Sequence, residues 1–450
     1  MHPFIRLIAL ITALAIGLVQ PAFGQNRGLS LIRDAEIENI IRDYSTPIFN
    51  AAGLDADSVT IHLVNDPRLN AFVAGGQRMF INTGLLMRAE SPEQVMGVIA
   101  HEAGHIAGGH LARLQDELRN AELKSILAMI VGTAAGLAAG DGRVAGAVIG
   151  GGTQAAFADL LKYSRTQESS ADSAGLKYLD QTGTSSRGLL VFFELLQREI
   201  RVTGGREHPY LSSHPLTNDR ITTVESHLAF SRFADAPTPP DLAKKHAMMR
   251  AKLVGFMEPL GTTLKLYPAT DNTLPALYAR AIAYYQQSDL GQALPLIDGL
   301  IAEEPENPYF YELKGQMLLE NGRVQDSLAP YQKMADLSPA EPLLRSALAK
   351  AQVESGNSAL LEDALSNLLV ATRSDPSLAG SWRLLTIVYG RLGMQGELAL
   401  SQAEFNLLSG DPKAAEALGK RALDLLATGS PGWIRAQDIV SESERQMKDK

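Results

Sequence analysis

The chain has 450 residues, of which 45% are hydrophobic and 20% charged, as in an ordinary globular protein. This length is too great for one compact core, so about two or three domains are expected. The formal net charge of -9 gives no general attraction to phosphate, and no nucleic-acid partner is expected. Cysteine is absent, which excludes disulfides, thiolate metal ligands and cysteine nucleophiles. Any metal must therefore be held by histidine and carboxylate side chains.

The N-terminus has the pattern of a secretory signal peptide. Arg6 precedes an apolar run over 7–19, and the small residues Ala22 and Gly24 stand just before Gln25. The run is shorter than the roughly 20 residues of a membrane span. An uncleaved N-terminal anchor is the alternative. Secretion together with the lack of cysteine predicts a periplasmic location, with association with the outer membrane as an extension of it.

A small sheet is expected ahead of the first long helix-rich region. Residues 31–49 show the apolar spacing of a helix, and 59–63 alternate as in a half-buried strand. Residues 70–73 and 79–82 can form two further strands around a glycine pair. We therefore predict a mainly α fold with a small antiparallel β-sheet.

The helix that follows carries the chemistry. Ser91 suits its N-cap and Pro92 its first helical position. Its His-Glu-Ala-Gly-His segment places His101 and His105 about 40° apart around the axis, with side chains roughly 5–6 Å from each other. The two imidazoles can bind one Zn²⁺, and a catalytic zinc needs one more protein ligand and one open position. Glu102 lies beside them, where a carboxylate can act as general base.

The short motif also arises by chance on amphipathic helices, so a third ligand is needed to support a metal site. Two residues are candidates for that position. His110 lies nine residues after His101, roughly 180° around a continuing helix, so it is expected to point away and to make structural hydrogen bonds. Glu168 lies four residues before Asp172, so the two share a helix face. Glu168 would bind the ion, and Asp172 would accept the other N–H of a ligand histidine. A solvated acidic face is the alternative.

Together these motifs resemble the M48 family of zinc metallopeptidases, and the resemblance covers nearly the whole chain after residue 24. The segments that carry the resemblance are, in chain order, Asn70–Gly76, His101–His105, Glu168–Asp172, and Ser213-His214-Pro215 with Asp219-Arg220-Ile221. The resemblance implies one zinc ion per chain on His101, His105 and Glu168. It also implies that Glu102 is the catalytic base and that Asp172 is an active-site acid or a support for a ligand. The implied fold is a gluzincin-like helical protease domain.

The family's histidine before proline corresponds to His214, where it would stabilise the oxyanion or cover the zinc in a latent state. His208 also precedes a proline but lacks the Arg-Ile sequel, and it ranks second. Periplasmic M48 members with repeat domains imply an endopeptidase that removes misassembled outer-membrane β-barrel proteins and assists their assembly. The competing hypotheses are a chaperone or scaffold with a latent or degenerate site, and an integral-membrane quality-control protease.

Residues 125–158 are rich in Ala, Gly, Ile and Val around a short polar turn. Three interpretations stay open: a membrane-spanning hairpin, a membrane-facing or lid-like helical pair, and ordinary packing. Each half is about 15 residues, which is short for a span. Peripheral membrane contact through this segment is therefore one of the expectations.

The C-terminal part is repetitive. Small, small, large and Pro residues recur with a 34-residue period, which is the tetratricopeptide signature; the matching sets are Ala281, Ala293, Ile297, Pro305 and Gly315, Ser327, Tyr331, Pro339. An α-solenoid of such repeats offers a surface for protein partners, here the outer-membrane protein assembly machinery and stalled barrel proteins by resemblance. Shielding of the protease cleft is the alternative role.

A Pro-rich stretch at 234–240 marks the boundary between the two periodic regions. The predicted division is a signal peptide at 1–24, a metallopeptidase domain at 25–232, a linker with a lead-in helix at 233–272, and repeats with capping helices at 273–450.

Overall fold

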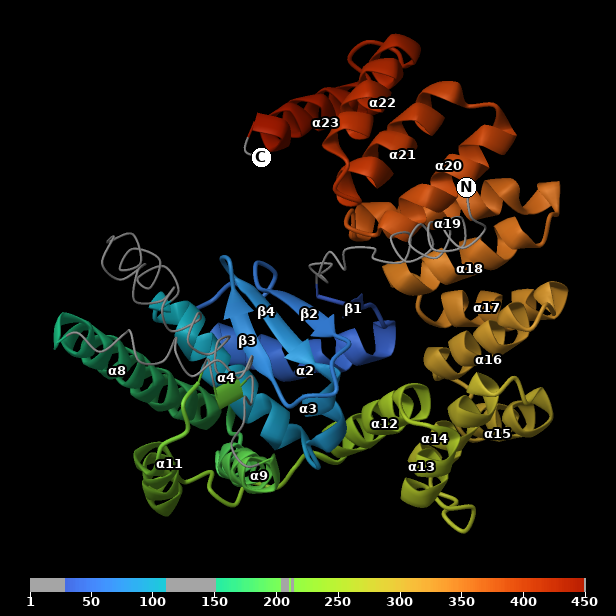
Figure 1. The fold of residues 1–450 in the computed structure, drawn as a ribbon. Helices are drawn as coiled ribbons and strands as arrows, with labels where there is room; N and C mark the ends of the chain where they lie inside the picture. Colours follow the sequence, from blue (N-terminus) through green and yellow to red (C-terminus); the bar gives the residue numbers. More distant parts are fainter. Residues whose placement is uncertain (1–28, 111–150, 204–209, 212–213, 449–450) are drawn as a thin grey trace, which may run out of the picture.

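The computed structural model describes residues 29–110, 151–203, 210–211 and 214–448 (Figure 1). The predicted fold class is confirmed: a helical N-terminal part with a small sheet is followed by a helical solenoid. The predicted signal peptide, His208 and most of the apolar segment 125–158 lie outside the described residues, and only the end of that segment is seen, as the start of a helix at Gly151. Within the described ranges, no helix is long and apolar enough to cross a membrane.

The sheet has four strands: β1 (Leu31–Ile32), β2 (Thr60–Val64), β3 (Ala71–Ala74) and β4 (Arg78–Asn82). Their order is β1-β2-β4-β3. The pairs β1–β2 and β3–β4 are antiparallel, but β2 and β4 are parallel, so the prediction of an antiparallel sheet is wrong for the central pair. The reason is that β4 turns back from β3 through a tight glycine hairpin and inserts between β3 and β2. Strand β3 is therefore an edge strand.

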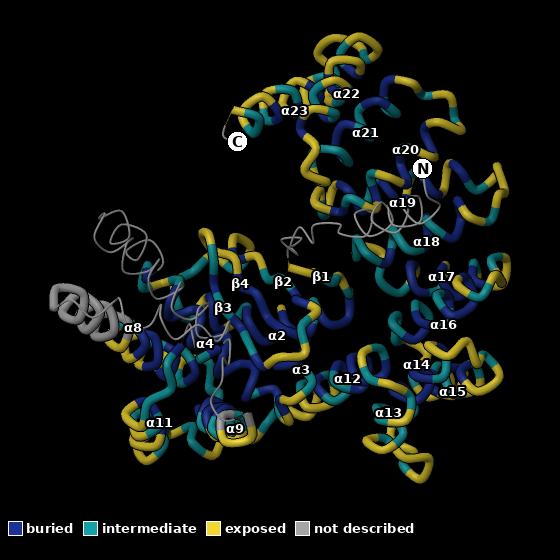
Figure 2. Tube along the Cα trace, in the orientation of Figure 1, coloured by how far each residue is buried: buried dark blue, intermediate teal, exposed yellow. Residues whose placement is uncertain are grey.

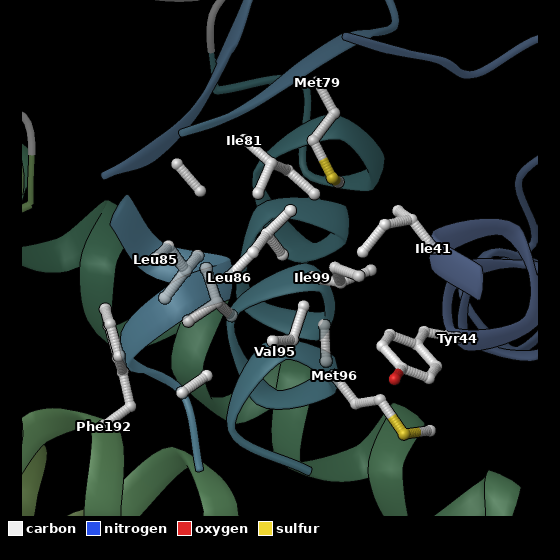
Figure 3. Close-up of a cluster of buried hydrophobic side chains, with 14 of the residues drawn as sticks. Ile41, Tyr44, Met79, Ile81, Leu85, Leu86, Val95, Met96, Ile99 and Phe192 are labelled. Carbon is white, nitrogen blue, oxygen red and sulfur yellow. The ribbon is translucent and has the colours of Figure 1, made fainter. Parts of the chain in front are cut away.

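Helices cover the sheet and form the rest of the N-terminal part. They are α2 (Ala35–Ala51), α3 (Thr83–Arg88), α4 (Pro92–Ala107), α8 (Gly151–Thr182), α9 (Arg187–Thr203), α11 (Asn218–Phe230) and α12 (Pro240–Met257). Tyr44 of α2 and Met79 of β4 are fully buried and meet α4 in the main hydrophobic core (Figure 3). Figure 2 shows that α4 is buried along most of its length. A helix buried in this way is a rigid support for side chains that must not move.

Close packing of α4 against α8 depends on glycines at the contact. A Cβ added to Gly104 of α4 would lie 2.8 Å from the backbone oxygen of Ala171, and one added to Gly175 of α8 would lie 3.2 Å from the Ala100 backbone. Both distances are shorter than ordinary van der Waals contact. The small residues therefore bring the two helices together at the level of the His-Glu-Ala-Gly-His segment.

The solenoid is built from helix pairs. Its helices are α13 (Leu260–Leu266), α14 (Leu274–Gln286), α15 (Leu290–Glu303), α16 (Pro308–Glu320), α17 (Val324–Leu337), α18 (Pro342–Glu354), the 3-10 turn η1 (Ser358–Leu360), α19 (Leu361–Ser374), α20 (Ala379–Leu392), α21 (Gln395–Leu408), α22 (Pro412–Leu425) and α23 (Pro431–Lys448). The pairing of a small with a large residue in the repeat follows from close packing, since a Cβ at Gly315 would lie 2.8 Å from the ring of Tyr331. The third repeat is longer because η1 stands between its two helices. Helices α22 and α23 cover the end of the solenoid, as a repeat array requires.

The two parts share a buried polar junction, and the solenoid curves around the side of the N-terminal part that carries α2 (Figure 1). Lys252 of α12 lies 2.8 Å from Asp34 and 3.1 Å from Glu36 at the start of α2, and Tyr278 of α14 donates a hydrogen bond to Glu36. Helix α12 lies in the stretch predicted as a linker with a lead-in helix, and its residues enter the cores on both sides. It is therefore a structural element of both parts.

Candidate metal centre

Four buried side chains converge from α4, α8 and the segment before α11. His101, His105, Glu168 and His214 each offer one donor atom, and these atoms all lie within 4.8 Å of one another. The Nε2 atoms of His101 and His105 are 3.1 Å apart, and Glu168 Oε1 lies 3.3 Å from His105 Nε2. His214 Nδ1 lies 3.3 Å from His101 Nε2 and 3.0 Å from Glu168 Oε1. The predicted ligands His101, His105 and Glu168 are thus brought together.

The spacing of these atoms suits one tetrahedral ion. With metal–ligand bonds of about 2.0–2.1 Å, neighbouring donors of a tetrahedron lie about 3.3–3.4 Å apart. The contacts within the cluster run from 3.0 to 3.4 Å. Two histidine nitrogens that face each other without a proton between them would repel, whereas a shared cation removes that conflict. The residues therefore fit a divalent metal.

Asp172 holds the first ligand histidine as predicted. Its Oδ1 atom lies 2.9 Å from His101 Nδ1, and its side chain is fully buried. The contact assigns the proton to Nδ1 and leaves the Nε2 lone pair facing the cluster. Burial alone would lower the pKa of His101, but the carboxylates of Asp172 and Glu168 outweigh it and raise the pKa to about 9. The ligand is therefore held by strong negative charge.

His110 contacts the second ligand histidine, contrary to the expected direction of its side chain. Helix α4 ends at Ala107, and Gly109 has a positive φ of 61°, which turns the chain back. The His110 ring then lies beside Gly108, where a Cβ would be 2.5 Å from its Nε2 atom. His110 Nδ1 lies 2.9 Å from His105 Nδ1. The predicted hydrogen-bonding role is thus present, but the prediction that His110 points away was wrong because it assumed that the helix continued.

Glu102 is poised without a hydrogen-bond partner. Its side chain is fully buried, and neither carboxylate oxygen has a hydrogen-bond partner among the described residues. His214 Nε2 lies 3.4 Å from Oε1. Burial raises the pKa of Glu102 to about 7. A carboxylate of this kind can exchange a proton with a bound water or substrate atom.

His214 stands inside the cluster and not at its rim. Its backbone N–H donates to the carbonyl of Tyr210, and the two rings lie 4.9 Å apart. Burial lowers the pKa of His214, so a neutral imidazole is favoured. Of the two roles open for this residue, the present position matches a fourth donor that covers the site.

Arg220 is a member of the centre whose role was missed, although its motif was noted. Its guanidinium contacts both oxygens of Asp172 at 2.6 and 2.8 Å and lies 2.9 Å from Glu168 Oε2. A buried pair of carboxylates four residues apart needs a nearby cation, and that need was a usable signal. With Glu102 also ionised, the three carboxylates exceed the one guanidinium by two charges, which one divalent cation would neutralise.

Comparison with known proteins supports this assignment. Residues 32–228 match peptidase family M48. This part of the chain is a family M48 peptidase domain. The match makes the chain a metalloendopeptidase whose centre takes a divalent metal. Residues 278–342 match the tetratricopeptide repeat, so the M48 domain is followed by repeats.

Two relatives align with most of the chain, and a third aligns with a shorter part of it. The "Beta-barrel assembly-enhancing protease" of Yersinia pestis is 24% identical over 84% of this chain and 78% of its own length. The protein of the same name from Escherichia coli (strain K12) is 24% identical over 93% of this chain and 85% of its own length. "Metalloprotease YcaL" of Escherichia coli (strain K12) is 28% identical over 38% of this chain and 61% of its own length.

Proposed function

We propose that the protein is a periplasmic, zinc-dependent endopeptidase that degrades misassembled outer-membrane β-barrel proteins and assists their assembly. The peptidase activity rests on the M48 domain. The link to barrel assembly is supported by relatives named for it, which align with most of the chain. The observation that carries the proposal is the converging set of His101, His105 and Glu168 donors beside the unpartnered carboxylate of Glu102.

Zinc is the metal that this donor set favours. Two imidazoles and one carboxylate are the ligands of a well-known class of catalytic zinc sites, and tetrahedral spacing is what Zn²⁺ prefers. Bound zinc would polarise the scissile carbonyl and lower the pKa of the attacking water. Asp172 and His110 keep the ligand imidazoles oriented by their contacts at Nδ1.

Proton transfer is assigned to Glu102. Its carboxylate accepts a proton from the attacking water and donates it to the leaving amine nitrogen. The burial that leaves this group without a partner also excludes competing solvent. His214, when it moves off the donor cluster, can donate from a ring nitrogen to the oxyanion. Asp172 acts through His101 and remains ionised, because hydrogen bonds from His101 and Arg220 outweigh burial and lower its pKa.

An extended substrate can be held by the sheet. Strand β3 is an edge strand that packs against α4, the helix that carries His101. An unfolded barrel strand can add to this edge through main-chain hydrogen bonds. The proposal therefore predicts that extended segments of many sequences can bind at this edge.

A second candidate is a latent protease that acts mainly as a chaperone or scaffold through its repeats. It is favoured by one observation, the place of His214 Nδ1 within 3.0 to 3.3 Å of Glu168 and His101. In that arrangement the fourth position is filled by the protein. Latency at rest is therefore part of the proposal, with displacement of His214 needed for cleavage.

Location and partners complete the proposal. The signal-peptide pattern at the N-terminus and the lack of cysteine support a periplasmic site. The repeats offer a solenoid surface for the outer-membrane assembly machinery. Peripheral membrane contact through 125–158 rests on composition alone.

The test compares wild type with Glu102→Gln on an unfolded outer-membrane barrel protein, with bound metals quantified in both. We expect equal zinc content and at least a hundredfold slower cleavage in the variant, as for loss of a general base. Equal cleavage rates would remove Glu102 from the mechanism, and a lack of zinc in the wild type would contradict the site. Rescue of a barrel-assembly defect by Glu102→Gln would instead favour the scaffold.

A further inference from the structure

Arg220 contacts side chains or backbone from each element that builds the metal centre, including His101 of α4, whose Nδ1 lies 3.5 Å from Nη2. Its Nε and Nη2 atoms donate to the two oxygens of Asp172, at 2.6 and 2.8 Å. Its Nη1 atom lies 2.9 Å from Glu168 Oε2 and donates to the carbonyl of Pro215 at 3.1 Å. The guanidinium thus joins α8, which carries both carboxylates, to the segment that holds His214.

The side chain is fixed in this position. Arg220 is only 4% exposed, and its guanidinium lies over the ring of Phe193 at 4.9 Å from the centroid. Thr217 caps α11 by accepting from the Arg220 backbone N–H, which anchors the residue at the first turn of that helix. A planar, always charged group that makes bidentate contacts cannot be replaced by a point charge without losing some of them.

The two carboxylate oxygens of Glu168 have different partners. Oε2 is the oxygen that Arg220 contacts, and it also lies 3.4 Å from His101 Nε2. Oε1 lies 3.3 Å from His105 Nε2 and 3.0 Å from His214 Nδ1. A carboxylate held at one oxygen presents the other in a defined direction. The Arg220 contact at Oε2 therefore fixes the orientation of the Glu168 carboxylate, with Oε1 directed at His105 and His214.

The hydrogen bond from Arg220 to the Pro215 carbonyl has a different effect. The Pro215 carbonyl follows His214 directly in the chain, so a donor at that carbonyl limits where the His214 backbone can lie. If the hydrogen bond from Nη1 to this carbonyl is broken, the contacts to Asp172 can remain, since Nε and Nη2 make them. The same side chain can thus keep the ligands ordered while the His214 segment is released.

We propose that Arg220 is a positioning residue with two separable actions: it orients Glu168 and Asp172 for metal binding, and it holds the His214 segment over the centre. The inference rests on the proposed zinc site. It predicts that metal affinity depends on the carboxylate contacts, and that the place of His214 depends on the Pro215 contact.

The experiment uses the full-length protein with Arg220→Lys and Arg220→Gln. Arg187→Gln is the matched control, because the Arg187 side chain is exposed and, among the described residues, pairs with the exposed carboxylate of Asp235. Zinc affinity is measured by competition with a chromogenic chelator. We expect a 10- to 100-fold loss in both Arg220 variants, the usual effect of removing a group that orients ligands, and no change in Arg187→Gln.

The second readout is the visible spectrum of the Co²⁺-loaded protein, which reports the ligand set directly. Arg220→Lys should alter the spectrum relative to wild type, because His214 is no longer held. In a His214→Ala background the same substitution should change the spectrum less than in wild type, because only the orientation of Glu168 is then affected, while the loss of affinity should remain. That pattern separates the two actions of Arg220.

Other results would overturn the inference. Wild-type zinc affinity and an unaltered Co²⁺ spectrum in Arg220→Lys would show that the guanidinium geometry is not needed. A lower melting temperature of the metal-free variants with unchanged affinity in the folded fraction would reduce Arg220 to a structural residue. A wild type that binds no zinc would contradict the proposed function itself. This outcome is distinguishable from failure of the inference, because zinc binding of the wild type is measured before the variants are compared.

Discussion

The Nδ1 atoms of His105 and His110 lie 2.9 Å apart, so one of these imidazoles donates its proton to the other. If His105 binds a metal through Nε2, its Nδ1 carries the proton and His110 accepts it. Histidine in this place does what a carboxylate or a backbone carbonyl does in other metal sites, without adding a negative charge. The two ligand histidines of α4 are therefore supported differently, one by Asp172 and one by a neutral ring.

Removal of this support should weaken metal binding. His110→Ala is expected to lower zinc affinity about tenfold, at the lower end for a group that orients a ligand. Chelator competition at neutral pH measures the change. His227→Ala is the control, since His227 pairs with Asp180 away from the centre. Equal affinities of His110→Ala and wild type would show that His105 is oriented by packing alone.

Substitution at the α4–α8 contact should separate the ligands. The Cβ of Gly104→Ala would meet the Ala171 backbone oxygen at 2.8 Å, so α4 and α8 must move apart. We expect a loss of about 1–3 kcal/mol in the free energy of unfolding, together with weaker zinc binding.

The control for this variant is Gly299→Ala in α15, where an added Cβ has no atom within 4 Å. That change should be neutral or stabilise by about 0.5–1 kcal/mol, because alanine favours the helix. Urea denaturation measures both. Similar stabilities of the two variants would mean that the helices tolerate a wider separation.

Acid should destabilise the protein through His246. This residue is 2% exposed and lies 2.8 Å from the Ala89 carbonyl oxygen and 3.2 Å from Tyr44 Oη. Burial lowers its pKa to about 4, against about 6.5 in the unfolded chain. The unfolded chain therefore binds a proton first as the pH falls, and stability contributed by neutral His246 is lost between about pH 6.5 and 4.

The expected loss is roughly 3 kcal/mol over that window, measured by urea denaturation at several pH values. A variant with His246→Gln should show a smaller loss over the same window, although its stability at pH 7 is lower. If the wild type and the variant have parallel pH profiles, His246 does not account for acid sensitivity.

The junction of the two parts should depend on Lys252. Its ammonium group lies 2.8 Å from Asp34 and 3.1 Å from Glu36, and its side chain is 4% exposed. Lys252→Met leaves buried negative charge without its partner, so we expect a loss of about 3–5 kcal/mol in the free energy of unfolding. Lys244→Met, at a half-exposed pair with Glu304, should change it by less than about 1 kcal/mol. Comparable effects would make the buried pair dispensable.

Much of the centre could be predicted because local spacing determines it. Two residues four apart on a helix share a face whatever the rest of the fold does, which explains why His101 with His105 and Glu168 with Asp172 meet as expected. The solenoid was predictable for a similar reason, since each repeat buries the same small-against-large contact. The roles of these site residues in catalysis stay predictions.

Other features depend on where an element ends or how elements pair, and spacing does not contain that information. His110 turned back because α4 stops before Gly109, and the sheet became mixed because β4 inserts beside β2. Arg220 was overlooked because its partners Asp172 and Glu168 lie about fifty residues earlier in the chain. The residue at which a helix ends, and the pairing of residues far apart in the chain, depend on the tertiary structure.

Helix α12 gives the molecule a property that neither part would have alone. Met249 faces the core of the M48 domain while Met248, its neighbour, faces the first repeat. A helix shared in this way couples the unfolding of both sides, so heat or denaturant should melt them in one cooperative transition. The repeats are then not an exchangeable module: a graft between relatives must carry α12 and both of its surroundings with it.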